Sequence, residues 1–351
     1  MDFFQPRISD EKLHHNFKYA RTPYRKAERE MFEAWANGMP DRDGKLCEQF
    51  QETFNSTFWE VYLHALLRSY GCSLSWEHSS PDFEACQREV RVIIDATTAN
   101  AAVGKPNEWD RTYSEEEIKS LGELWPLNRE AIIRLSNALH GKITKFNTHY
   151  STKHHVKGKP FVVAVAPFEQ PHFNLQHDRP IRALLYDHYV DEDAFTKSPD
   201  NFPSGPPVRK LGFVEKDNGS EIRLGLFTDN AASCVSAVLF SCVATWGKLT
   251  AMSKNPLVDG SIKSLWSTPP TGKPVWRDAP LQEHHEELWD GVHVYHNPFA
   301  TNPLPPGFFR RKGVVQHYFD QGLDEWAYEG IYEALLFRRV LVKAREQERE
   351  G

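Results

Sequence analysis

Apolar and polar residues recur along much of the chain with the spacing of helices. Glycines close the first two of these stretches, as is common just after a last helical turn. The third carries an apolar stripe along one side. The pattern predicts three long helices and one short helix, at residues 22–38, 52–70, 128–150 and 181–189.

Shorter apolar runs between these helices predict strands. The run "KPFVVAVAPF" is bounded by Pro160 and Pro167 and has the composition of a strand buried on both faces. The segment 79–100 contains a further apolar run, "VRVIID", and predicts a hairpin. The order helix, strands, helix, strand is that of an α/β fold. Additional candidate strands are "CSLSW", "RLGLF", "CVSAVLFSCV" and "GVHVYH".

The pattern divides the chain into three parts. Residues 1–50 are predicted to be a helical, charged N-terminal extension. Residues 51–300 are predicted to form a core with insertions, one of which is the Pro-, Gly- and Ser-rich stretch 197–218. Residues 301–351 are predicted to be a loop and a closing helix from 323 to 347, whose last turns are basic, as the helix dipole prefers.

The composition limits which classes of protein the chain can belong to. The 351 residues are 40% hydrophobic and 26% charged, which is ordinary for a globular chain. No apolar run approaches the roughly 18 residues that span a bilayer, and the N-terminus lacks the regions of a secretory signal. The five cysteines form no CxxC pair. We therefore expect a cytoplasmic protein with reduced thiols and no membrane partner.

Charge is distributed unevenly. The formal net charge of −6 argues against a protein that coats nucleic acid by bulk electrostatics. Between residues 129 and 160, however, seven Lys or Arg residues face a single acid, Glu130. Such a cluster could contact phosphates, and a solvated helix face followed by a loop explains it equally well.

Three acids are candidates for chemistry. Taken singly, each has a structural explanation: Asp82 follows Pro81 in a turn, Asp95 caps a strand, and Glu60 could form a capping box with Thr57. Taken together, Asp82 and Asp95 point to a shared site. A hairpin that has one acid at the start of its first strand and another at the end of its second strand brings both carboxylates to one sheet edge. Two carboxylates at one edge can bind a hard cation such as Mg²⁺, which prefers oxygen ligands.

The segments that carry these acids resemble the PD-(D/E)XK nucleases, the restriction-endonuclease-like superfamily. The motifs are "FWEVYLHALL", "SPDF", "VIIDATTAN", "HGKITKF" and "KPFVVAVAPF", in this order between residues 52 and 168. The resemblance implies a mixed sheet flanked by helices. It also implies Mg²⁺ or Mn²⁺ held by Glu60, Asp82, Asp95 and the carbonyl of Ala96.

The chain departs from this family at Thr97, where the family's motif has a lysine that orients the attacking water and stabilises developing charge. Threonine carries no charge, although its hydroxyl could hydrogen-bond a metal-bound water. The helix at 128–150 offers a replacement, since Lys142 flanks the apolar stripe whereas Lys145 lies nearer the polar side. A surface lysine that only covers apolar neighbours would look the same.

We therefore expect a divalent-metal-dependent nuclease, acting in restriction, defence or repair, with DNA favoured over RNA and a homodimer as one assembly. The alternative is a catalytically inactive nuclease-fold module that binds nucleic acid or a protein. No Walker loop, dinucleotide-binding glycine fingerprint or GxSxG elbow is present, and the neighbouring histidines at 284–285 and 293–296 are not spaced to chelate a metal. The expected nucleic-acid contacts are Arg134, Lys145, Lys153 and Lys157.

Overall fold

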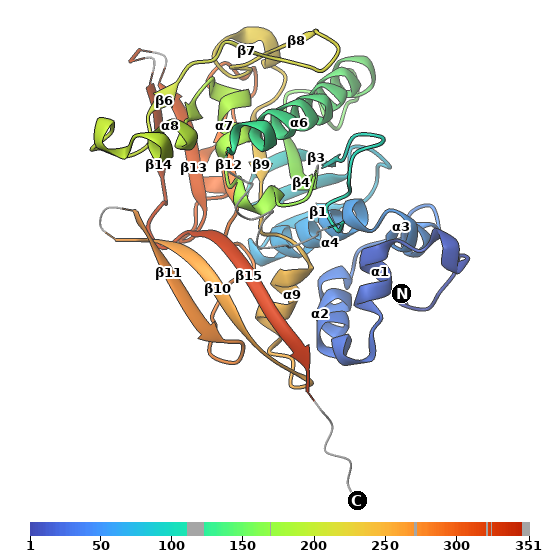
Figure 1. Ribbon diagram of the computed structural model, residues 1–351. Helices are drawn as coiled ribbons and strands as arrows, with labels where there is room; N and C mark the ends of the chain where they lie inside the picture. Colours follow the sequence, from blue (N-terminus) through green and yellow to red (C-terminus); the bar gives the residue numbers. More distant parts are fainter. Residues whose placement is uncertain (111–122, 169, 270–271, 321, 324, 346–351) are drawn as a thin grey trace, which may run out of the picture.

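The computed structural model describes residues 1–110, 123–168, 170–269, 272–320, 322–323 and 325–345. At its centre is an eight-stranded mixed sheet with the order β1-β2-β3-β4-β9-β12-β13-β14 (Figure 1). The fold is thus mixed α/β with a large sheet flanked by helices, as the sequence predicted. The strands are β1 (Ser73–Ser75), β2 (Phe83–Gln87), β3 (Val90–Asn100), β4 (Phe161–Phe168), β9 (Ala237–Phe240), β12 (His293–His296), β13 (Val315–Asp320) and β14 (Glu325–Glu329).

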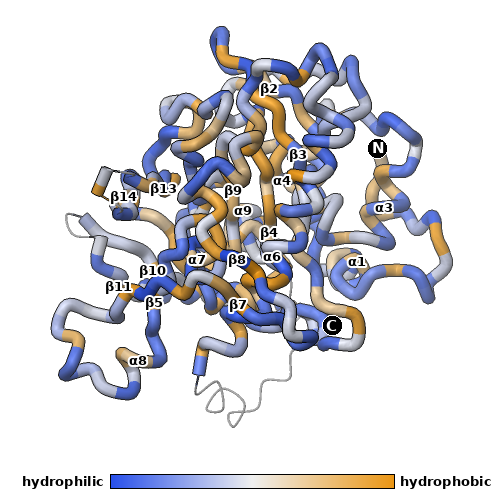
Figure 2. The backbone as a smooth tube through the Cα atoms, turned by 90° about the horizontal axis from the view of Figure 1, so that it is seen from above, coloured by the Kyte–Doolittle hydropathy of each residue, from blue (hydrophilic) through white to orange (hydrophobic). Residues whose placement is uncertain are grey.

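Parallel and antiparallel pairs are mixed within the sheet. Strands β2 and β3 form an antiparallel hairpin, and β3, β4 and β9 run parallel to one another. Strand β12 is antiparallel to β9, and β13 is parallel to β12. Every residue of β4 is buried, as its uninterrupted apolar sequence predicts for a strand covered on both faces. In Figure 2, β4 and β9 accordingly lie among hydrophobic segments at the middle of the molecule.

Helices cover both faces of the sheet. Thr98 of β3 hydrogen-bonds Ser56 on α4 (Phe54–Ser69), whereas Asp95 of β3 pairs with Lys142 on α6 (Trp125–Lys145). Alternate residues of a strand point to opposite faces, so α4 and α6 lie on opposite sides. Helix α7 (Arg179–Tyr186) packs beside α6 on the same side (Figure 1).

The N-terminal 50 residues are helical, as predicted, and belong to the main core. They contain α1 (His15–Ala20), α2 (Lys26–Ala36) and α3 (Leu46–Glu52), which lie beside α4 (Figure 1). Buried phenylalanines from this region stack on Phe54 and Phe58 of α4. The region therefore shares one hydrophobic core with the sheet, through Phe3, Phe17, Phe32 and Phe50.

The predicted closing helix is wrong. The described residues from 325 to 344 form β14 and β15 (Leu335–Ala344), and β15 pairs antiparallel with β10 (Val258–Thr268) along most of its length. This pairing outweighs the local helical preference, because β-propensity and helix propensity both yield to tertiary context. Gly330 marks the break, since its φ is 78° and an added Cβ would lie 2.2 Å from the Val314 carbonyl oxygen.

Strand β10 also pairs with β11 (Lys273–Pro280), which completes a second, three-stranded sheet at the lower left of Figure 1. Helix α9 (Trp246–Ser253) connects β9 to it. The predicted strand "RLGLF" is also wrong, because only Arg223 of this run is in a strand and Gly225 turns the chain with a φ of 76°. Among the described residues, no helix has both the length and the apolar composition needed to cross a membrane.

Short elements complete the described chain. The segment predicted as an exposed insertion, 197–218, consists largely of loops and two-to-three-residue strands with many exposed residues. The short strands and helix are β5 (Tyr189–Val190), β6 (Val208–Arg209), β7 (Phe213–Glu215), β8 (Glu221–Arg223) and α8 (Glu192–Lys197). Single turns are η1 (Asp10–Lys12), η2 (Pro23–Arg25), η3 (Phe146–Tyr150), η4 (Phe173–Leu175), η5 (Pro199–Asn201), η6 (Asn230–Ala232) and η7 (Pro306–Phe308).

Candidate active site

The β2–β3 hairpin brings two aspartates together. Phe83 pairs with Ile94 in the antiparallel register, so Asp82 and Asp95 lie at neighbouring positions across the two strands. The Asp82 carboxylate accepts a hydrogen bond of 2.7 Å from the backbone N–H of Ala96, which fixes its direction. Asp95 is fully buried within β3. The two acids that the sequence singled out therefore share one site.

Lys142 lies between these two carboxylates. Its ammonium nitrogen is 3.0 Å from Asp95 Oδ2 and 4.0 Å from Asp82 Oδ2, and its side chain is only 15% exposed. Helix α6 follows the acidic hairpin in the chain and crosses the face of the sheet to which Asp95 points. The prediction that this lysine reaches the carboxylates from the helix is confirmed; its role in catalysis remains a prediction.

Lys145 and Tyr150 border the same site. Lys145 was predicted to lie nearer the polar side of the helix; its side chain is 44% exposed, and its ammonium still lies 3.9 Å from Asp95 Oδ2. The Tyr150 hydroxyl donates a hydrogen bond of 3.5 Å to Asp95 Oδ1. Both Lys145 and Lys153 lie over the Tyr150 ring, at 5.1 and 5.2 Å from its centroid. Tyr150 was not identified from the sequence.

The position of Tyr150 depends on a change in helical pitch. Residues Phe146–Tyr150 form a π-helical turn directly after α6. Such turns are rare and are frequent at functional sites. Tyr150 ends this turn with a buried side chain, and its hydroxyl reaches Asp95.

Glu60 reaches the site from the opposite face of the sheet. Burial, the charge of Asp82 and the weaker influence of Asp95 raise the pKa of Glu60 to about 7. The capping-box explanation for Glu60 does not hold, because α4 begins at Phe54 and Thr57 lies inside the helix. A small cavity of about 190 Å³ adjoins the carboxylate, and its lining residues are Ser56, Glu60, Ala96, Thr97, Thr98 and Asn100.

The electrostatics of the site suit a divalent cation. Burial, followed by the nearby Asp95 charge, raises the pKa of Asp82 to about 6. Asp95 Oδ2 is buried, and the Lys142 ammonium lies 3.0 Å from it. The carboxylates of Asp82 and Asp95 provide only oxygen donors, which Mg²⁺ prefers. These two acids therefore fit a cation bound beside Lys142, whereas Glu60 does not join them in one group of ligand atoms within 4.8 Å of one another.

The other predicted nucleic-acid contacts are distributed unequally. Lys153 donates a hydrogen bond of 2.6 Å to the Ser80 hydroxyl, two residues before Asp82, so it lies beside the site. Arg134 is paired with Glu130 at 3.1 Å on α6, and Lys157 is exposed in the loop that follows. The structure thus brings Lys145 and Lys153 to the acidic site and engages Arg134 in a local ion pair.

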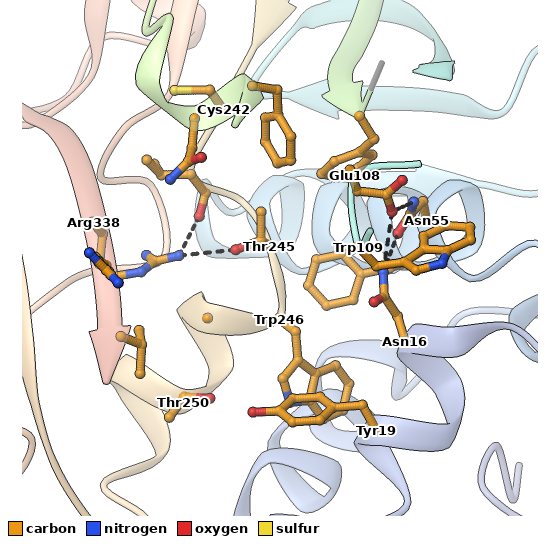
Figure 3. A pocket seen from close by; sticks show the side chains of 18 of the residues that line it. Asn16, Tyr19, Asn55, Glu108, Trp109, Cys242, Thr245, Trp246, Thr250 and Arg338 are labelled. Atoms are coloured by element: carbon orange, nitrogen blue, oxygen red, sulfur yellow. Dashed lines mark hydrogen bonds between the residues drawn. The ribbon is translucent and has the colours of Figure 1, made fainter. Parts of the chain in front are cut away.

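Two larger cavities lie away from the acids. The first, about 690 Å³, is lined by aromatic, aliphatic and polar residues and lies between the N-terminal helices, β15 and the carboxyl ends of β4 and β9. Figure 3 shows Trp246 and Tyr19 on one side of it and the hydrogen-bonded side chains of Asn16, Asn55 and Glu108 on the other. The second, about 530 Å³, shares Asn174, Leu175 and Phe337 with it and extends to the start of α7.

A buried polar cluster at the second cavity was missed by sequence reasoning. Asp178, His293 and His317 offer ligand atoms that all lie within 4.8 Å of one another. The sequence places His293 close only to His296, whereas its hydrogen-bond partner in the fold is His317 on the neighbouring strand, at 2.9 Å. No local spacing could reveal this, because the three residues come from three separate elements.

Protein-family models, curated proteins and solved structures contain no match to this chain.

Proposed function

We propose that the protein is a divalent-metal-dependent nuclease with a restriction-endonuclease-like core that hydrolyses phosphodiester bonds, with DNA as the favoured substrate. The observation that carries the proposal is the position of Lys142 between the Asp82 and Asp95 carboxylates. A lysine beside two acids can take over the task of the motif lysine that Thr97 replaces. Helix α6 supplies the charge that β3 lacks.

Each side chain has a distinct task in this proposal. Asp82, Asp95, Glu60 and the Ala96 carbonyl would hold Mg²⁺ or Mn²⁺. Such an ion lowers the pKa of a bound water and neutralises charge on the phosphoryl group. The Lys142 ammonium stabilises the charge that spreads over the phosphoryl oxygens as the bond breaks. Thr97 is one of the residues that line the adjoining cavity, and its hydroxyl would orient a water bound to the metal.

The rim of the site supports nucleic acid as the substrate. The ammonium groups of Lys145 and Lys153 both lie over the Tyr150 ring, whose hydroxyl bonds Asp95. Lysines that remain partly exposed can bind backbone phosphates without fixing the sequence that is bound. We therefore expect Lys145 and Lys153 to increase the affinity for nucleic acid, and Lys142 to increase the rate of cleavage.

Cleavage by the purified chain tests the proposal. Single- and double-stranded DNA and RNA are incubated with Mg²⁺ or Mn²⁺, and with a chelator as the control. We expect shortened products in the metal-containing samples and intact nucleic acid with the chelator. Intact nucleic acid under every condition would contradict the proposal.

Lys142→Ala is expected to lower the single-turnover cleavage rate by about 10²-fold, as loss of a positioned electrostatic group commonly does. Lys145→Ala, whose side chain is more exposed, should instead weaken nucleic-acid binding in a salt-dependent way. Lys26→Ala is the control, since Lys26 is an exposed lysine on α2, outside the acidic site. Wild-type cleavage by Lys142→Ala would show that the helix does not replace the missing lysine.

A second candidate function is a nuclease-fold module that binds nucleic acid without cutting it. The observation in its favour is the 3.0 Å ion pair between Lys142 and Asp95, in which the ammonium could neutralise the acid in place of a metal ion. If this is correct, Lys142→Ala should bind Mn²⁺ more tightly than the wild type while neither protein cleaves. Cleavage by the wild type would exclude it.

A further inference from the structure

Buried polar atoms without partners gather at the second cavity. Fifteen buried side-chain nitrogens and oxygens make no hydrogen bond among the described residues, and seven of them surround the start of α7. Leaving such atoms unpaired is costly, so each needs an explanation, such as a ligand or water. The seven are Gln176 Nε2 and Oε1, His177 Nε2, Arg182 Nε, Tyr295 OH, His317 Nδ1 and Trp326 Nε1.

Gln176 is the most informative of these residues. Its side chain lines the cavity of about 530 Å³, it is 3% exposed, and neither atom of its amide is paired. A backbone turn or a local side chain would normally use at least one of them. Two large aromatic residues, Trp276 and Tyr328, line the same cavity and remain 55% and 45% exposed. The cavity thus combines a buried amide with accessible aromatic rings.

Charge at the base of the cavity is already balanced. Asp178 accepts hydrogen bonds from Arg179 at 2.6 Å and Arg182 at 3.3 Å, and Arg179 also pairs with Glu192 at 2.7 Å. Burial lowers the pKa of His293 to about 3, and burial likewise lowers the pKa of His317, so both imidazoles are neutral. A ligand that binds at the base of the cavity therefore needs no strong charge of its own.

A metal ion at Asp178, His293 and His317 fits poorly. Two guanidinium groups already occupy the carboxylate of Asp178, and a divalent cation beside them would add repulsion in a buried site. His293 and His317 also hydrogen-bond each other at 2.9 Å, which uses one nitrogen of each ring. A neutral organic ligand is the better match.

We propose that this cavity binds a single nucleobase. The Gln176 amide presents a donor and an acceptor side by side, which is the arrangement that pairs with the edge of a base. Trp276 and Tyr328 supply rings on which a base can stack, and stacking tolerates any base. The volume lies within the range of small-molecule sites, roughly 300–1,000 Å³.

The nucleobase could come from a nucleic-acid strand or from a free nucleotide. The sheet register links Asp95 through Val163, Val238 and Tyr295 to His317, so the acidic site and the base of the cavity lie on one face of the sheet. Four strand spacings separate them, roughly 19 Å. The strand source rests on the proposed nuclease function, whereas the free-nucleotide source does not.

Binding of adenosine, guanosine, cytidine and thymidine, measured by titration calorimetry without metal, tests the site. We expect at least one nucleoside to bind, and Gln176→Leu to weaken its affinity about tenfold or more. Trp276→Ala, at the exposed rim where folding is not at risk, should also weaken it. Gln170→Leu is the matched control, because Gln170 is a buried glutamine of the same connection that bonds the Leu127 carbonyl outside the cavity.

Oligonucleotides that contain 2-aminopurine, bound to Asp95→Asn so that cleavage cannot interfere, distinguish the sources. A fluorescence change that Gln176→Leu removes identifies a base of the strand, whereas nucleoside binding without it identifies a free nucleotide. If neither nucleosides nor the labelled strand depend on Gln176, and Gln176→Leu merely raises the melting temperature, the cavity holds water and the proposal is wrong. If the protein proves not to cleave nucleic acid, the nucleoside-binding result still stands, because nucleoside binding does not depend on the proposed nuclease function.

Discussion

Asp95→Asn is expected to abolish metal-dependent cleavage, lowering the rate by about 10³-fold or more. The substitution keeps the size of the side chain but removes a buried negative charge that would hold the cation and that faces Lys142. Without that charge the metal binds weakly, and its stabilisation of the phosphoryl charge is lost. Asp82→Asn should have the same consequence, because both carboxylates belong to one site.

The effect must be separated from misfolding. Circular dichroism and thermal melting of Asp95→Asn are expected to show a folded protein, since the lost ion pair with Lys142 is offset by relief of the repulsion between Asp95 and Asp82, and Asp82 still faces Lys142. Glu30→Gln, on an exposed face of α2, is the control and should cleave at the wild-type rate. Normal cleavage by folded Asp82→Asn and Asp95→Asn would place the metal site elsewhere.

Glu286→Ala is expected to destabilise the protein by about 3–5 kcal/mol, the cost of breaking a buried ion pair from one side. The Glu286 carboxylate pairs with Lys248 at 2.6 Å and with Arg338, and all three side chains are almost fully buried. The variant leaves two buried cations without their acid. Urea unfolding measures the loss of free energy, and Asp259→Ala, which breaks the exposed pair with Arg345, should change stability far less.

The same carboxylate predicts a pH dependence. Burial alone would raise the pKa of Glu286, but Arg338 and Lys248 outweigh it and lower the pKa from 4.5 to about 2. A folded-state pKa below the unfolded value contributes stability that is complete above pH 4.5 and is lost as the pH falls towards 2. Glu286→Ala should therefore show a flatter decline of stability across that window, and an unchanged decline would contradict this assignment.

Local sequence patterns were sufficient to predict that the two aspartates and Lys142 of the acidic site lie together. Asp82 and Asp95 could be brought together because a hairpin has a regular register, and Lys142 could be placed because α6 keeps a regular pitch up to Lys145. Lys145 keeps a side chain that is 44% exposed and still comes within 3.9 Å of Asp95, since a helical projection gives the direction of a side chain but not the reach of its four-carbon stem. Tyr150 was missed because its sequence position marks it only as a core residue, and its contact with Asp95 depends on the fold.

Contacts between distant segments were beyond the sequence. The C-terminal residues contain good helix formers, and only pairing with β10 makes Leu335–Ala344 a strand, although Gly330 in the predicted helix was a warning. The cluster of Asp178, His293 and His317 joins three elements whose neighbourhood depends on the strand order. Gln176 could not be identified from the sequence, because an amide without hydrogen-bond partners can be recognised only when the surrounding structure is known.

The central claim is that the carboxylates around Lys142 hold a divalent ion that drives cleavage. Single-turnover cleavage of labelled DNA, titrated with Mn²⁺ while electron paramagnetic resonance follows the bound metal in the same samples, tests it most directly. We expect the rate to rise with metal occupancy, and both to disappear in Asp95→Asn. Wild-type protein that binds no Mn²⁺, or DNA that stays intact when the site is full, would contradict the account.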